Sequence, residues 1–252
     1  MAEYNEEMTF WDHLEELRFT LIRCFVGMII GMLICYSFGD ELVKFLLKPY
    51  VEYTGNKVMN LKPTEGFVTK LEVSAIAGLF LAFPYVLYQL WAFIAPGLYK
   101  NEKKLIFPVI FFATLLFFGG GAFGYFNLDY AFIFLTEFEI TEYTQNAYSL
   151  NYTVSFISRF LLAFAISFQE PIVIYILAKM GIATPEFLRQ KRKYAFVIIL
   201  IVAAVVTPTT DPFTFLLMAL PLQLLYEVGI FVAGKVKPVE IEEEEENSIE
   251  PT

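Results

Sequence analysis

Residues 88–104 read Y-Q-L-W-A-F-I-A-P-G-L-Y-K-N-E-K-K, and within them a long apolar run stops at Pro96 and gives way to charge. The aromatic side chains of this stretch, among them Trp91 and Tyr99, favour the headgroup layer of a membrane, and its three lysines favour the cytoplasmic side. The stretch therefore predicts a cytoplasmic loop between two membrane spans. Its one carboxylate, Glu102, is either a solvated charge neutralised by the lysines or a group with a function of its own.

The composition of the chain is that of an integral membrane protein. Hydrophobic residues make up 57% of its 252 residues and the mean hydropathy is +0.57, which is more apolar than an ordinary soluble domain. The net charge of −9 comes mainly from two acidic ends, at residues 3–16 and 240–246, and such runs are usually solvated. They predict neither a basic partner nor nucleic-acid binding. The N-terminus lacks the basic segment and short apolar core of a cleavable signal peptide, so the first span is expected to direct insertion.

Six apolar segments predict an all-α integral membrane protein with six transmembrane helices. They form a single domain over residues 1–235, followed by an acidic, disordered tail at 236–252. Residues 9–23 predict an amphipathic helix along the membrane interface, and 40–66 and 127–151 are expected to be outer loops, the first with room for short helices. The predicted spans cover residues 19–38, 68–94, 105–126, 152–178, 194–206 and 213–233.

Glycine spacing and span length add two expectations about packing. Gly27 and Gly31 have the small-xxx-small spacing that lets a second helix approach the first span closely. The span at 194–206 measures only about 20 Å as a helix, against a hydrocarbon core of roughly 30 Å. The last two spans are therefore expected to be short and to make one side of the molecule shallow.

The distribution of cations predicts that both termini are cytoplasmic. Under this N-in, C-in model, twelve of the 18 Lys and Arg residues fall on the inner side. Five lie between Lys44 and Lys70 on the outer side, and Arg159 remains within the fourth span. Cytoplasmic loops carry such an excess of cations.

No catalytic or metal-binding motif is present, so the sequence predicts no enzyme, no cofactor and no metal. The informative residues are Gln169 and Glu170 in the fourth span, because an ionisable group at membrane depth is costly and is a functional candidate by default. Arg159 lies about 16 Å away along that helix, too far for a direct pair. Glu227 is near enough to a helix end to reach the interface. His13, the single histidine, is expected to have a capping or surface role.

Four stretches together resemble the TatC family, the large subunit of the twin-arginine protein translocase. The resemblance runs in order along nearly the whole chain, and the stretch at 88–104 is its most specific part. The other three stretches are H-L-E-E-L-R-F-T-L at 13–21, S-F-Q-E-P at 167–171 and G-I-A-T-P-E-F-L-R-Q-K-R-K-Y at 181–194.

This resemblance implies a receptor and core subunit in the cytoplasmic (inner) membrane of a prokaryote. Such a subunit binds twin-arginine signal peptides of folded substrates, assembles with single-span TatA/TatB-type subunits in the lipid bilayer, and uses the proton-motive force. It also implies a concave, glove-like bundle and a possible homo-oligomer. The motif positions place the paired arginines of the signal peptide on two cytoplasmic carboxylates, Glu16 and Glu102.

The resemblance also marks residues around this pair and elsewhere. It assigns Arg18, Phe93 and Pro96 to signal-peptide binding, and it singles out Pro49, Tyr125 and Asp211 as further family positions. In the fourth span, the family's polar residue commonly lies two positions before the proline, which here is Gln169, whereas the carboxylate is Glu170. Which of these two side chains faces the interior groove, and so docks a partner, stays open.

Two other functions remain open beside this one. A proton-coupled secondary transporter of a small solute would use Glu170 as a proton relay, but such transporters often show inverted repeats and paired interrupted helices, and neither is clear here. A passive membrane scaffold would tolerate replacement of Glu16 and Glu102 without loss.

Overall fold

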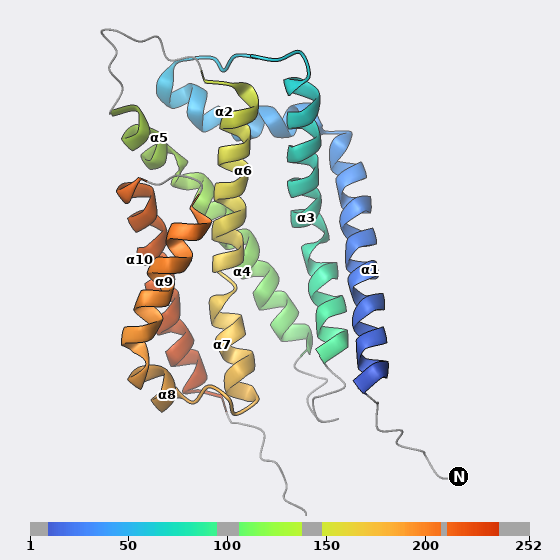
Figure 1. Cartoon of the computed structure of the whole chain (residues 1–252), viewed down its shortest axis with the longest axis vertical. Helices are drawn as coiled ribbons and strands as arrows, with labels where there is room; N and C mark the ends of the chain where they lie inside the picture. Colours follow the sequence, from blue (N-terminus) through green and yellow to red (C-terminus); the bar gives the residue numbers. More distant parts are fainter. Residues whose placement is uncertain (1–9, 95–105, 138–147, 208–210, 237–252) are drawn as a thin grey trace, which may run out of the picture.

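The structure is a computed structural model that describes residues 10–94, 106–137, 148–207 and 211–236. The regular elements within these ranges are helices, apart from one isolated parallel bridge between Met59 and Ser149 (Figure 1). In chain order the helices are α1 (Phe10–Tyr36), α2 (Gly39–Thr54), α3 (Glu65–Ile94), α4 (Ile106–Phe126), α5 (Leu128–Glu137), α6 (Leu150–Ser167), α7 (Glu170–Lys179), α8 (Pro185–Gln190), α9 (Arg192–Val206) and α10 (Pro212–Ala233).

Most of the helices run along the long axis of the molecule, and α2 lies across their upper ends (Figure 1). The start of α1, the short helix α8 and the end of α10 all lie at the opposite, lower end. Among the described residues, five segments are long and apolar enough to cross a membrane: Trp11–Tyr36, Glu65–Phe93, Phe107–Thr136, Leu150–Lys179 and Pro212–Ala233. The prediction of an all-α, multi-pass membrane protein is thus confirmed.

Helix α1 packs along α3 through glycines, as the spacing of Gly27 and Gly31 predicts. A Cβ added at Gly31 would lie 2.5 Å from the carbonyl oxygen of Gly78 on α3, and one added at Gly78 would collide with the backbone of Met32. The two backbones are therefore in direct contact. Residues 10–23, expected to be an amphipathic helix that lies along the interface and then enters the bilayer, form the first part of α1, which is one continuous helix from Phe10 to Tyr36.

Two segments expected to be outer loops contain sizeable helices. Helix α2 fills most of the first loop and buries Leu46 and Tyr50 against the bundle. Helix α5 begins the second loop, with Leu128 and Phe132 in the core. Polar residues surround both segments, so the one apolar face of each was not recognised in the sequence. Burial of that face against the bundle stabilises these helices.

The fourth predicted span, 152–178, is two helices rather than one. Helix α6 ends at Ser167 and α7 begins at Glu170, because Pro171 has no N–H to donate to the carbonyl of Ser167. Around the break, the backbone N–H of Gln169 bonds to the carbonyl of Ile166 at 2.9 Å instead. This break places Gln169 and Glu170 at a helix junction.

The last two helices differ in length. Helix α9 has 15 residues, so it is short as predicted, but α10 has 22, and the prediction that both are short is wrong. Helix α10 begins with Pro212 at its first position and continues past Pro221 to Ala233. The upper ends of α9 and α10 lie well below α2, and α5 lies above them (Figure 1), where Phe134 stacks on Phe213 with ring centroids 5.1 Å apart.

Candidate functional site

The lower ends of α1 and α3 carry three of the predicted site residues, Glu16, Arg18 and Phe93. The ring of His13 on α1 stacks on that of Phe93 on α3, with centroids 4.3 Å apart and planes 17° from parallel. Glu16 follows His13 by three residues and is partly buried, whereas Arg18 is exposed. His13 is exposed as predicted, and its ring fixes the end of α1 against α3.

Glu16 carries an unsatisfied oxygen. Its Oε2 is buried and has no hydrogen-bond partner in the described part of the chain. A buried acceptor without a partner costs on the order of 1–3 kcal/mol, more when it is charged, so such an atom calls for a donor. A guanidinium group, with its fork of N–H donors, is suited to a carboxylate in this position.

The other two members of the predicted peptide site, Pro96 and Glu102, lie outside the described residues. They belong to the connection between Ile94, where α3 ends, and Ile106, where α4 begins. The structure therefore neither joins Glu102 to Glu16 nor separates them.

Pro49 and Tyr125, far apart in the sequence, both act on the backbone carbonyl of Phe45 at the upper end. As a proline inside α2, Pro49 cannot donate to the carbonyl of Phe45 four residues earlier. The hydroxyl of Tyr125 on α4 donates to that carbonyl at 3.1 Å, and its ring stacks on Phe45 with centroids 4.6 Å apart. The pair thus fastens α2 to α4 and has no contact with the lower end.

Asp211 caps α10. Its Oδ1 accepts a hydrogen bond from the backbone N–H of Thr214 at 2.6 Å, which satisfies one of the open donors of the first turn. Its other oxygen, Oδ2, is buried without a partner among the described residues. The position is at the upper end of the helix, so its role here is to start α10.

Gln169 and Glu170 have different surroundings, although both are partly buried. The amide Nε2 of Gln169 donates to the carbonyl of Ala113 on α4 at 3.1 Å. Glu170 has a buried Oε2 with no partner in the described ranges. Helix α7 packs against α10, where the side chain of Ile174 fills the space above Gly229. Gln169 is thus occupied within the bundle, and Glu170 retains an acceptor for another group.

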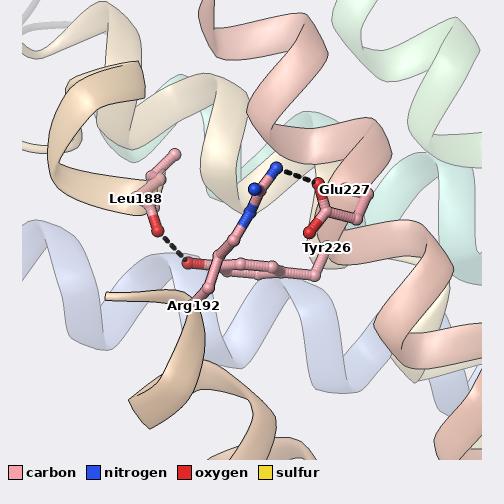
Figure 2. Close-up of polar contacts among 4 residues, drawn as sticks. All are labelled: Leu188, Arg192, Tyr226 and Glu227. Carbon is pink, nitrogen blue, oxygen red and sulfur yellow. Dashed lines mark hydrogen bonds and ion pairs between the residues drawn. The ribbon is translucent and has the colours of Figure 1, made fainter. Parts of the chain in front are cut away.

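A polar cluster at the lower end of α8, α9 and α10 was not predicted. Arg192 donates from Nη2 to Glu227 Oε2 at 2.5 Å, and the hydroxyl of Tyr226 donates to the carbonyl of Leu188 at 2.9 Å (Figure 2). Glu227 therefore has a partner on α9 instead of only reaching the interface. The pair is about half exposed, so it contributes little to stability, but together with Tyr226 it sets the position of α8.

A second unpredicted cluster joins α3 to α6 at the upper end. Glu65 accepts hydrogen bonds from Ser149 Oγ at 2.7 Å and from the N–H of Leu61 at 2.8 Å, and Glu72 accepts one from Ser155 Oγ at 2.5 Å. The sequence did contain a signal for this cluster, because Glu65 and Glu72 are seven residues apart and so lie on one face of a helix.

Comparison with known proteins gives independent evidence about the family of this chain. Residues 12–221 match the model of the family described as TatC, Sec-independent protein translocase protein. The Sec-independent protein translocase protein TatC of Carboxydothermus hydrogenoformans is 39% identical over 237 residues, which covers 94% of this chain and 97% of the relative. The protein of the same name from Aquifex aeolicus is 38% identical over 232 residues, or 91% of this chain and 95% of the relative.

Two solved structures share the fold. Both are crystal structures of the twin-arginine translocase receptor TatC, one of them in the detergent DDM, and both are 37% identical to this chain. Their TM-scores are 0.77 and, in DDM, 0.79; the matches cover 88% of this chain and 97% and 99% of those proteins.

Proposed function

Because the chain belongs to the TatC family of Sec-independent protein translocase proteins, we propose that it is the subunit that receives twin-arginine signal peptides at the cytoplasmic face. The observation that carries this proposal is the buried, unpartnered oxygen of Glu16 beside the stacked pair of His13 and Phe93. Binding of a twin-arginine peptide to the purified protein, against the same peptide with twin lysines, tests it. Equal affinity for the two peptides would contradict the proposal.

The proposed site consists of two carboxylates at one end of the bundle. Glu102 precedes Ile106, the start of α4, by four residues, so chain length alone keeps it within about 14 Å of that helix end. The start of α4 lies at the same lower end as the start of α1, the helix that carries Glu16 (Figure 1). Each carboxylate would take one arginine of the pair as a forked, charge-assisted hydrogen bond. Phe93 and Pro96 would provide the apolar surface beside them.

Arg18 would act at the edge of this site. It is exposed and two residues from Glu16, and residues two apart on a helix do not face each other. Its cation would therefore contact a different part of the peptide or its surroundings.

The proposed topology has six spans, with α9 as the fifth and both termini in the cytoplasm. Single cysteines at Lys57 and Gln190 test it, because both positions are exposed and lie at opposite ends of the bundle. In a background with Cys24 and Cys35 replaced by serine, we expect an impermeant maleimide to label Lys57→Cys from outside. We expect it to label Gln190→Cys only after permeabilisation. Labelling of Gln190→Cys in intact cells would overturn this topology.

Glu170 is proposed to dock the single transmembrane helix of a partner subunit in the membrane, where the assembled translocase draws on the proton-motive force. Its buried Oε2 lacks a partner within the described bundle, whereas Gln169 is bonded to α4. Helices that meet in lipid gain little from hydrophobicity, so one interhelical hydrogen bond can bias where they dock.

Replacement of Glu170 by alanine is expected to reduce partner crosslinking by about threefold. This factor corresponds to one interhelical hydrogen bond of about 0.6 kcal/mol. The measurement is crosslinking to the single-span partner from a neighbouring position on α7. Gln169→Ala is the control: it removes the bond to Ala113 and should lower thermal stability, with crosslinking unchanged. If Gln169→Ala reduced the crosslinking and Glu170→Ala left it unchanged, docking would be assigned to Gln169.

A further inference from the structure

The lower ends of α8, α9 and α10 carry a band of cations and aromatic rings, here called the basic collar. It comprises Arg189, Lys191, Lys193 and Lys235 together with the rings of Phe187, Tyr194 and Phe231, all exposed. Arg192 is left out of this set because it is paired with Glu227.

Cations and rings are in contact within the collar. The ammonium group of Lys191 lies 5.9 Å from the ring centroid of Phe187 and 5.3 Å from that of Tyr194, and Lys235 lies 4.4 Å from that of Phe231. Each ring therefore holds a lysine close to the surface of the helices. These side chains form a surface with fixed positive charge.

The collar borders an apolar surface. Directly after Tyr194, the α9 side chains Phe196, Val197, Ile198 and Ile201 are all exposed, as lipid-facing side chains are in a membrane helix. Aromatic rings and cations in such a position belong at the level of the lipid headgroups. The described carboxylates nearby are Glu186, which is exposed, and Glu227, which Arg192 neutralises.

We propose that the basic collar binds the phosphate groups of anionic phospholipids. Basic clusters between membrane helices on the cytoplasmic side attract such headgroups, and this collar combines the charge with rings at the right depth. Binding itself does not depend on the proposed function; only the assignment to the inner leaflet rests on the proposed topology. The lower end is then divided between a carboxylate site on α1 and a phosphate site on α8 to α10.

Native mass spectrometry of the purified full chain in detergent can test this. The protein would be titrated with phosphatidylglycerol and, separately, with phosphatidylcholine of the same chain length. The test variant is Arg189→Gln, Lys191→Gln, Lys193→Gln, and its matched control is Lys44→Gln, Lys48→Gln, Lys57→Gln, which removes the same charge at the opposite end. Circular dichroism and gel filtration would confirm that both triple variants fold.

We expect the collar variant to bind phosphatidylglycerol about a hundredfold more weakly and the control to stay within about twofold of the wild type. Phosphatidylcholine binding should not change. Equal losses in both variants would overturn the proposal in favour of a net-charge effect. If millimolar inorganic phosphate displaced bound phosphatidylglycerol as effectively as added lipid does, the collar would be assigned to free phosphate instead.

The last part of the experiment uses a chain truncated after Lys237, which lacks the acidic run at 240–246. If phosphatidylglycerol bound only to the truncated chain, the acidic tail and not lipid would occupy the collar, and the proposal would be wrong. The collar variant should still bind twin-arginine peptide. Failure of peptide binding by the wild type, with lipid binding intact, would count against the proposed function alone.

Discussion

Glu102→Ala is expected to weaken the binding of a twin-arginine peptide by roughly ten- to a hundredfold. Hydrogen bonds to charged groups contribute about 1.5–3 kcal/mol each, and about 1.4 kcal/mol corresponds to a factor of ten. Glu16→Ala is expected to have a similar or smaller effect. Fluorescence anisotropy of a labelled peptide with purified protein measures both affinities.

The effects of the two replacements should also depend on each other. Consecutive arginines held by two carboxylates form one network, and residues in one network show interaction energies of about 0.5–3 kcal/mol in double-mutant cycles. Glu186→Ala is the matched control, since it removes an exposed carboxylate from α8 at the same end of the bundle. A double variant that binds peptide as well as the wild type would show that the site lies elsewhere.

Gly78→Val is expected to separate α1 from α3 and to lower the melting temperature by about 5–10 °C. A Cβ at this position collides with the backbone of Met32, which cannot move unless the whole helix shifts, and such overpacking typically costs 1–3 kcal/mol or more. Gly31→Val should act in the same way from the other helix. Thermal unfolding in detergent measures the effect.

The control for this packing is Gly119→Val on α4. There a new Cβ meets no described atom within 4 Å outside its own stretch of helix, so no steric cost is expected, and valine is a slightly better helix former than glycine. A disulfide between His13→Cys and Phe93→Cys reports the register of the two helices, because their rings stack in the wild type. We expect Gly78→Val to abolish this crosslink and Gly119→Val to keep it. Equal melting temperatures for both variants would contradict the glycine contact.

The parts of this fold that could be predicted depend on local pattern. The long apolar segments predicted most of the membrane helices, and Gly27 and Gly31 predicted the close contact of α1. Thr184 before Pro185 is a local capping signal for α8, and its hydroxyl accepts from the N–H of Phe187. Each of these signals is contained in a short run of the sequence.

The parts that could not be predicted depend on contacts across the chain. Arg192 meets Glu227 over 35 residues, and Tyr125 reaches Phe45 over 80, so no periodicity shows either partner. The length of α2 and the existence of α5 were not predicted, because the apolar face of each helix is recognisable only where the bundle covers it. For the candidate site, family motifs assigned Glu16 and Phe93 to one peptide site, but the unpartnered oxygen of Glu16 became visible only in three dimensions.

Helix α9 has a consequence for the elasticity of the membrane. With α9 as a span, its 15 residues extend over about 22 Å, so lipids beside it must compress from a resting hydrocarbon thickness of roughly 30 Å. This deformation costs fractions of a kcal/mol per Å and is stored in the surrounding lipid as strain. The strain is released when another protein segment replaces the compressed lipid. A polypeptide that crosses beside α9 thus meets a bilayer that is already thinned. Its passage relieves part of the elastic strain in the lipid.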